Sequence, residues 1–218
     1  MRQLILDLLP EASPSLENFV AGSNAEVLTG LADWLAPTRH EPLFFLWGDA
    51  GAGKSHLLQA CQASYLDAQL DADLSGISPD SSWHAVDNVE ALSEIGQIAL
   101  FNLINRLPAH AGRLLAAASV PPLRLAMRED LRTRLASGLL YRLQPLSDAE
   151  KLAALAEQAR ARGLVLPPDA FNYLFSRAPR DMRSLAALLA TIDRYSLEHK
   201  RPVTLPLLRE ILQTSLNI

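Results

Sequence analysis

A phosphate-binding loop is the feature that most constrains how this chain can fold. It lies between an apolar run at residues 43–47 and a helix-like stretch beginning at Ser55, and it reads Gly48, Asp49, Ala50, Gly51, Ala52, Gly53, Lys54, Ser55. Glycines let the backbone curl around an anion, so that successive N–H groups and the start of the following helix point at phosphates. A glycine-rich turn that only caps a helix is the alternative. The complete spacing in a strand-to-helix setting instead predicts an α/β fold that binds a nucleoside diphosphate or triphosphate.

Three further residues define the chemistry expected at this loop. Lys54 is predicted to neutralise the β- and γ-phosphates, and the Ser55 hydroxyl to ligate Mg²⁺. Asp87 ends a short run at residues 83–87, where a strand-end carboxylate would complete the Mg²⁺ site, although such an aspartate can also be a helix cap. The next residue is Asn88, and a carboxamide cannot deprotonate water. Because Glu90 is expected past the strand tip, intrinsic hydrolysis should be slow or absent.

Composition narrows the partners and the compartment. The 218 residues carry a net charge of −4, which argues against a broad electropositive surface, so any DNA contact is expected to be indirect or weak. The single cysteine, Cys61, has no partner for an internal disulfide and is predicted to pack in the helix behind the loop. The sequence has neither a membrane-spanning apolar run nor a leader pattern, so we expect a cytoplasmic protein.

Strands alternate with helices over the first two thirds of the sequence. A helix stopped by Pro37 is predicted to begin at Asn24 or Ser23 as its N-cap. Strands are expected at 43–47, 83–87, 113–118 and 139–143, with a helix at 91–107 and a loop at 68–82 that holds one weak strand. This alternation predicts a parallel, doubly wound sheet.

The last third has only helical patterns. Ser147 to Glu150 opens a helix that Gly163 ends, and three more are expected at 167–177, 180–200 and 205–216. We therefore expect an N-terminal peptide at 1–15, an α/β nucleotide domain at 16–146 and a small all-helical lid at 147–218.

Two arginines stand where they could act on a nucleotide. Arg134 comes just before the last predicted strand, and Arg183 lies near the start of a lid helix. A guanidinium stabilises phosphoryl charge, so one could act on the chain's own nucleotide and the other on a neighbour's. Either could instead be a solvated helix charge.

Several runs together resemble the AAA+ portion of the replication initiator DnaA, and more closely its shorter regulatory paralogues, the Hda family. They are residues 16–24, 47–58, 86–90, 119–122 and 143–148. The Asp87–Asn88 pair and the run 143–148 favour the Hda family. Length does so too, because DnaA has a further C-terminal helix-turn-helix domain whereas this sequence ends after the lid. Ser119 and Val120 replace a more polar pair at the first sensor position.

The resemblance implies an AAA+ fold and a set of roles. Such a protein, carrying ADP or ATP with Mg²⁺ and bound to the sliding clamp on DNA, promotes hydrolysis of DnaA's ATP and so represses re-initiation of replication. Arg134 matches the arginine finger presented in trans, and Arg183 matches the lid arginine that senses the protein's own nucleotide. Phe19 and Val20 fall where the adenine is flanked, and His56 closes the nucleotide-contacting run that begins at Gly48.

The N-terminal residues resemble a clamp-binding peptide. Gln3 and Leu4 match the anchors of the Gln-Leu-x-Leu peptides that dock into the DNA polymerase III β sliding clamp, and Leu6 and Leu8 would fill its apolar groove. The alternative is an amphipathic strand folded onto its own domain.

Two other functions compatible with the loop stay open. One is an autonomous AAA+ ATPase of the loader or transposition-helper type. The other is a relative that recruits factors to DNA without affecting DnaA's nucleotide. The sequence also leaves self-association open.

Overall fold

The computed structural model describes residues 13–36, 41–78, 81–107, 112–167, 169–177, 179, 181–199 and 201–216. The clamp-binding residues predicted from the sequence, Gln3, Leu4, Leu6 and Leu8, lie outside the described residues. The chain divides into two compact units, with a boundary between Pro145 and Leu146.

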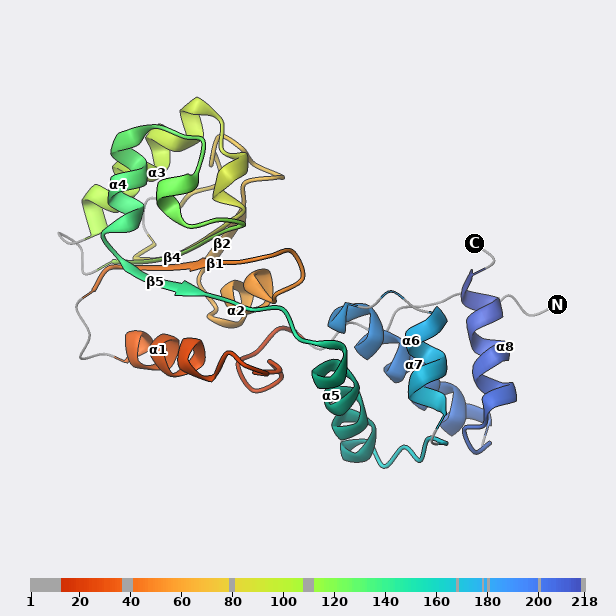
Figure 1. The fold of residues 1–218 in the computed structure, drawn as a ribbon. Coiled ribbons are helices and arrows are strands. Elements are labelled where there is room, and N and C mark those ends of the chain that lie inside the picture. Colours follow the sequence, from red (N-terminus) through yellow and green to blue (C-terminus); the bar gives the residue numbers. More distant parts are fainter. Residues whose placement is uncertain are drawn as a thin grey trace. The chain divides into compact units, whose positions relative to one another are not determined.

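The first unit is built on a parallel sheet in the order β2-β3-β4-β1-β5 (Figure 1). Its strands are β1 (Leu43–Trp47), β2 (Ser64–Asp67), β3 (Trp83–Asp87), β4 (Arg113–Ala118) and β5 (Leu139–Arg142). The predicted α/β fold is confirmed. The weak strand expected within 68–82 is wrong in position, because β2 ends at Asp67 and the described part of that stretch contains only turns and bends. No β2 residue is fully buried, so its sequence lacks the apolar signal of the central strands.

Helices cover both faces of this sheet. In Figure 1, α1 (Ala25–Leu35) and α2 (Lys54–Ala60) lie on one side of the sheet, and α3 (Glu94–Arg106) and α4 (Glu129–Ala136) on the other. Alternate residues of β1 enter different cores: Phe44 and Leu46 pack with α1 and α2, while Leu43 and Phe45 pack with α3 and α4. Burial on both faces explains why β1 reads as an uninterrupted apolar run.

The start of α1 differs from the sequence prediction in one respect. Asn24 is the N-cap residue, but its side chain makes no capping hydrogen bond. Instead the buried Asn24 amide pairs with the backbone of Gln144: Nδ2 donates to the Gln144 carbonyl at 2.9 Å, and Oδ1 accepts from its N–H at 2.8 Å. The amide thereby joins the beginning of α1 to the segment after β5, 120 residues away in the sequence.

The helix predicted from Ala91 begins later. Residues Val89–Ala91 form a 3-10 turn, η1, and α3 starts at Glu94 with Ser93 as its N-cap, whose hydroxyl accepts the Gly96 N–H at 3.1 Å. A second 3-10 turn, η3 (Pro122–Arg124), follows β4. These turns shape the edge of the sheet where the strands end.

The described residues of the second unit form four helices, as the sequence predicts: α5 (Asp148–Ala161), α6 (Ala170–Arg177), α7 (Met182–His199) and α8 (Leu205–Leu216). Ser147 and Glu150 form a reciprocal capping box at the start of α5. Gly163 ends the helix in the left-handed region, φ +69°, and the Leu164 N–H donates back to the Ala159 carbonyl at 2.9 Å. Among the described helices of the chain, none is long and apolar enough to cross a membrane.

Replacing Asn24 tests its structural role. We expect Asn24→Ala to lower the free energy of unfolding by about 2 kcal/mol, because both hydrogen bonds to Gln144 are lost. Urea denaturation measures the change. Ser23→Ala, at the exposed neighbouring position, should change stability by less than about 0.5 kcal/mol. Equal losses in the two variants would contradict this role of the amide.

Candidate nucleotide-binding site

The phosphate-binding loop runs from the end of β1 into α2, and two of its glycines have a positive φ and a close neighbour. A Cβ at Gly48 (φ +152°) would collide with the Leu143 carbonyl oxygen. A Cβ at Gly53 (φ +100°) would lie 2.7 Å from Cε2 of Phe19. Position 48 therefore needs glycine for space as well as for backbone conformation, whereas position 53 needs it chiefly for its left-handed backbone conformation.

The Lys54 ammonium is enclosed by its own loop. Its Nζ donates to the carbonyl oxygens of Gly48 at 2.7 Å and Asp49 at 3.0 Å, and the residue is only 9% exposed. Burial lowers the pKa of Lys54, while the negative charges of Asp87, Glu90 and Asp49 act to raise it. These three acids therefore act electrostatically on the Lys54 ammonium, which the sequence predicts to bind the phosphates.

Asp87 is fully buried at the end of β3, and two donors hold its carboxylate. Oδ2 accepts from the Tyr65 hydroxyl at 3.0 Å, and Oδ1 accepts from the Asn88 N–H at 2.9 Å. Burial first, and then the charges of Asp87 and Asp67, raise the pKa of Tyr65 to about 12, so the phenol stays protonated as a donor. Sequence reasoning missed Tyr65, because only the register of β2 against β3 brings it diagonally beside Asp87.

The side chain of the residue after Asp87 is bonded to the neighbouring strand β2. Asn88 adopts φ +53°, and its Nδ2 donates to Oδ1 of Asp67 at 2.8 Å. Glu90 lies past the strand tip, as expected, but its Oε1 accepts the Ser119 N–H at 2.8 Å. No local sequence pattern predicts this contact, because it joins residues 29 positions apart.

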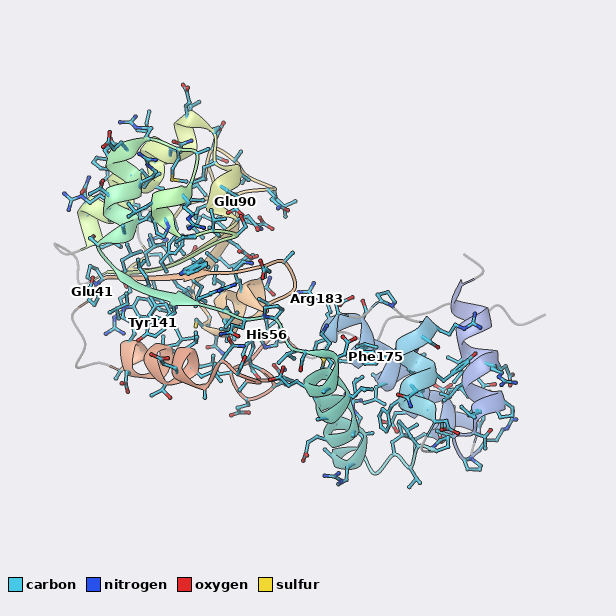
Figure 2. All side chains as sticks on the ribbon, in the orientation of Figure 1. Glu41, His56, Glu90, Tyr141, Phe175 and Arg183 are labelled. Carbon is cyan, nitrogen blue, oxygen red and sulfur yellow. The ribbon has the colours of Figure 1, made fainter. Side chains whose placement is uncertain are left out.

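The segment before α1 folds against the start of α2. Ser15 and Asn18 exchange hydrogen bonds between side chain and backbone in a tight turn. His56, labelled in Figure 2, donates from Nε2 to the Ser15 carbonyl at 3.0 Å, and its ring lies 5.5 Å from that of Phe19. The structure thus brings Phe19, Gly53 and His56 together. The neighbouring Val20 is half-buried.

The donors expected for Mg²⁺ are hard oxygens that suit that ion. Ser55 is half-buried in the first turn of α2, and Asp87 ends β3. Within the described residues there is no group of three or more His, Cys, Asp and Glu side chains that could hold a metal by themselves. A Mg²⁺ held by Ser55 and Asp87 would take its remaining oxygens from phosphates and water, as in other phosphate-loop proteins.

The two candidate arginines lie in different units. Arg134 is exposed in the last turn of α4, and no described residue pairs with its side chain. Arg183 is exposed in the first turn of α7, where the Asp181 carboxylate accepts the Ser184 N–H at 2.8 Å. The nucleotide-sensing role of Arg183 stays a prediction.

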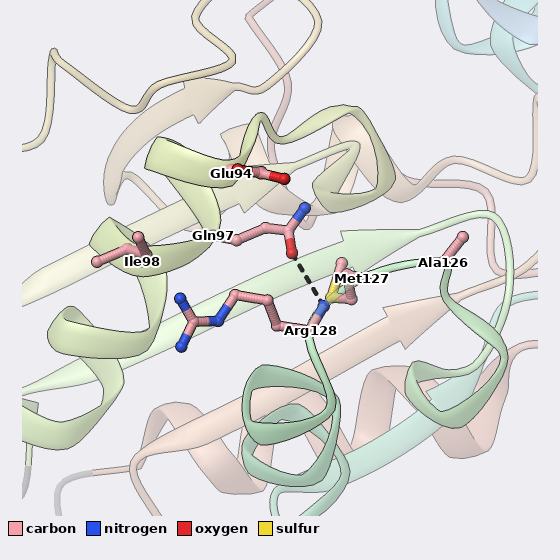
Figure 3. Close-up of a pocket in the computed structure, with 6 residues that line it drawn as sticks. All are labelled: Glu94, Gln97, Ile98, Ala126, Met127 and Arg128. Atoms are coloured by element: carbon pink, nitrogen blue, oxygen red, sulfur yellow. Dashed lines mark hydrogen bonds between the residues drawn. The ribbon is translucent and has the colours of Figure 1, made fainter.

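A separate hollow of about 580 Å³ opens between α3 and the segment before α4 (Figure 3). Across it the Arg128 N–H donates to Oε1 of Gln97 at 3.0 Å. It is lined by Glu94, Gln97, Ile98, Ala126, Met127 and Arg128, none of which belongs to the phosphate-binding loop.

Comparison with family models decides the classification. Residues 11–92, which include the loop and Asp87, match the model described as the bacterial DnaA ATPase domain. Residues 148–212 match the lid domain of Hda. The chain belongs to the DnaA-related AAA+ proteins. Its helical second unit is a lid of the Hda type, consistent with the Hda resemblance of the sequence.

Solved structures agree with this AAA+ fold. Domain III of the DnaA replication initiation protein from Thermotoga maritima superimposes with a TM-score of 0.72 at 19% identity, over 97% of this chain and 99% of that one. AMPPCP-bound DnaA from Aquifex aeolicus gives 0.65 at 22% identity, over 89% and 70%. RuvB from Thermotoga maritima gives 0.63 at 16% identity, over 94% and 72%. At these identities the likeness concerns the fold.

Removing the loop ammonium tests the site. We expect Lys54→Met to weaken ADP binding at least about 100-fold, because the main positive charge facing the phosphates is lost. Titration calorimetry with ADP and Mg²⁺ measures the affinity, and thermal unfolding verifies the fold. Lys151→Met, which removes a lysine from α5 of the other unit, should bind ADP like the wild type. Undiminished binding by Lys54→Met would remove this loop from the phosphate site.

Proposed function

We propose that this protein is a nucleotide-dependent regulator that promotes hydrolysis of DnaA-bound ATP and so represses re-initiation of chromosomal replication. It would act in the cytoplasm, bound to an adenine nucleotide and to the sliding clamp on DNA. The observation that carries the proposal is an exposed Arg134 on a core that has Asn88 directly after Asp87, where ATPases of this branch usually carry a second acid. Such a core is better suited to act on a partner's nucleotide than on its own.

Nucleotide binding would use the loop and the segment that packs on it. Residues 48–56 would hold the phosphates, Ser55 and Asp87 would hold Mg²⁺, and Phe19 and Val20 would flank the adenine. The contact of Phe19 with Gly53 and His56 supports this arrangement, because it brings an aromatic ring next to the loop. Arg183 would sense the bound nucleotide from the lid. Bound Mg²⁺ would supply charge neutralisation at the phosphates.

The environment of Asn88 supports slow intrinsic hydrolysis. A carboxamide oxygen is not basic enough to take a proton from water. Here the amide is also engaged, since its Nδ2 donates to Asp67 and its backbone N–H donates to Asp87. Asn88 therefore serves to shape the strand end, and hydrolysis in the proposed mechanism occurs on DnaA.

Arg134 would supply the charge that DnaA's nucleotide requires. Its guanidinium lies at the surface, whereas nearby Arg128 is paired with Asp130 at 2.6 Å. A guanidinium that is not engaged with a carboxylate can be presented to the phosphates of a neighbouring molecule, where it stabilises charge in the transition state of phosphoryl transfer.

The arginine assignment predicts a separation of functions. We expect Arg134→Ala to bind ADP normally. Its stimulation of DnaA's ATPase should be at least about 100-fold weaker than that of the wild type, in line with the effect of arginine fingers. Arg134→Lys should restore little, because an ammonium lacks the planar fork. The assay measures phosphate release by DnaA with clamp-loaded DNA.

A matched control uses the exposed Arg124 of η3, whose replacement by Ala should leave stimulation unchanged. Full stimulation by Arg134→Ala would remove the finger role. Turnover by this protein alone near 10 s⁻¹, typical of enzymes, would favour the autonomous ATPase instead.

Clamp binding rests on the resemblance of the N-terminal residues, which lie outside the described part of the structure. We expect the double variant Gln3→Ala, Leu4→Ala to lose the DNA polymerase III β clamp in a pull-down, because both anchors of the peptide are gone. Asp7→Ala should retain it, since that position is not an anchor. If the double variant still binds the clamp, the clamp contact lies elsewhere in the chain. Association with DNA would then not depend on this peptide.

A further inference from the structure

The order of the strands indicates that the terminal phosphate of a bound nucleotide would lie near the carboxyl end of β4. β4 is between β1, which leads into the phosphate-binding loop, and β3, which ends at Asp87. In an open parallel sheet, ligands bind at the carboxyl ends of the strands. Ser119 is the first residue after β4, so its backbone N–H lies at this edge, between the elements that hold the loop and the Mg²⁺ ligand.

This N–H is already bonded to an acid of the same chain. Oε1 of Glu90 accepts it at 2.8 Å. Glu90 reaches it from η1, a turn closed by the Ala91 N–H donating to the Asn88 carbonyl at 2.8 Å and entered through the left-handed backbone of Asn88. Figure 2 labels Glu90 on this turn after β3. A tight turn thus places a carboxylate on the donor at the end of β4.

The same carboxylate acts on the phosphate-binding lysine. Glu90 is one of the three acids whose negative charge raises the pKa of Lys54, against the larger effect of burial. The negative charges of Asp87, Glu90 and Asp49 therefore all act on the single ammonium of the loop. Asp87 has a use as a Mg²⁺ ligand, but Glu90 has none in the proposed mechanism. An extra negative charge here opposes any further phosphate at the end of the nucleotide.

We propose that Glu90 is a specificity-determining residue that makes this site favour a nucleoside diphosphate over a triphosphate. Its carboxylate occupies the Ser119 N–H, which a terminal phosphate oxygen would otherwise accept, and repels that phosphate. A diphosphate does not extend that far from the loop and keeps its contacts with Lys54 and the loop amides. This inference rests on the proposed nucleotide binding and adds the basis of its selectivity.

The test compares the affinities of two nucleotides for the full chain. Titration calorimetry with Mg²⁺ measures the Kd of ADP and of AMPPCP, which cannot be hydrolysed to ADP. Glu90→Gln keeps the size of the side chain and an acceptor for the Ser119 N–H but removes the charge. Glu90→Ala removes both. Thermal unfolding of each variant verifies that the fold persists.

We expect Glu90→Gln to bind AMPPCP at least about tenfold more tightly, because a like charge beside the terminal phosphate is removed, while ADP affinity changes less than about twofold. Glu90→Ala should favour AMPPCP at least as strongly. Glu94→Gln is the matched control, because Glu94 is an exposed glutamate in the first turn of α3. It should leave both affinities unchanged.

Three results would overturn the proposal. If the ratio of the two affinities is unchanged in both Glu90 variants, Glu90 does not determine the selectivity, while the nucleotide site itself still stands. A loss of ATP turnover in Glu90→Gln at unchanged affinities would make the carboxylate a catalytic group acting on water instead. A wild-type protein that binds neither nucleotide would overturn the nucleotide site itself, and the selectivity with it.

Discussion

The burial of β1 on both faces is the constraint on which the rest of the first unit depends. Phe44 and Leu46 enter one core, and Leu43 and Phe45 enter the other, so the strand cannot shift by one residue without exchanging the two sets. β1 pairs with β4 on one side and β5 on the other. Because the register of β1 is fixed in this way, the loop that follows begins level with the carboxyl ends of β4 and β5.

Local patterns explain what the sequence could predict. The phosphate-binding loop, the buried strands and the capping box of α5 each depend on residues close together in the chain, and Gly163 ends α5 because it can adopt a positive φ. Contacts between distant segments could not be predicted. The Asn24 amide suits a helix cap, yet it bonds Gln144, and Tyr65 meets Asp87 only because of the register between β2 and β3. The strand β2 itself was misplaced because it is short and half-buried.

Asn88 and Glu90, which both follow Asp87 closely in the chain, bond to different parts of the sheet edge. The amide at position 88 turns toward β2, and the carboxylate at position 90 turns toward β4. Sequence reasoning located both residues correctly, but it treated Glu90 as too far along the chain to matter. The left-handed backbone at Asn88 turns the chain back toward the end of the sheet. Glu90 therefore lies close to the end of β4, although its position in the sequence suggests that it has left the sheet.

The pairing of Asn24 with Gln144 has a mechanical consequence for the connection that follows. Both backbone polar groups of Gln144 are engaged by one side chain, so neither of the two peptide groups that flank its Cα can rotate without breaking a hydrogen bond. Pro145 comes next, and its ring fixes φ. The first backbone torsion after the sheet that neither these hydrogen bonds nor a ring restrains is therefore ψ of Pro145, directly before the second unit begins at Leu146.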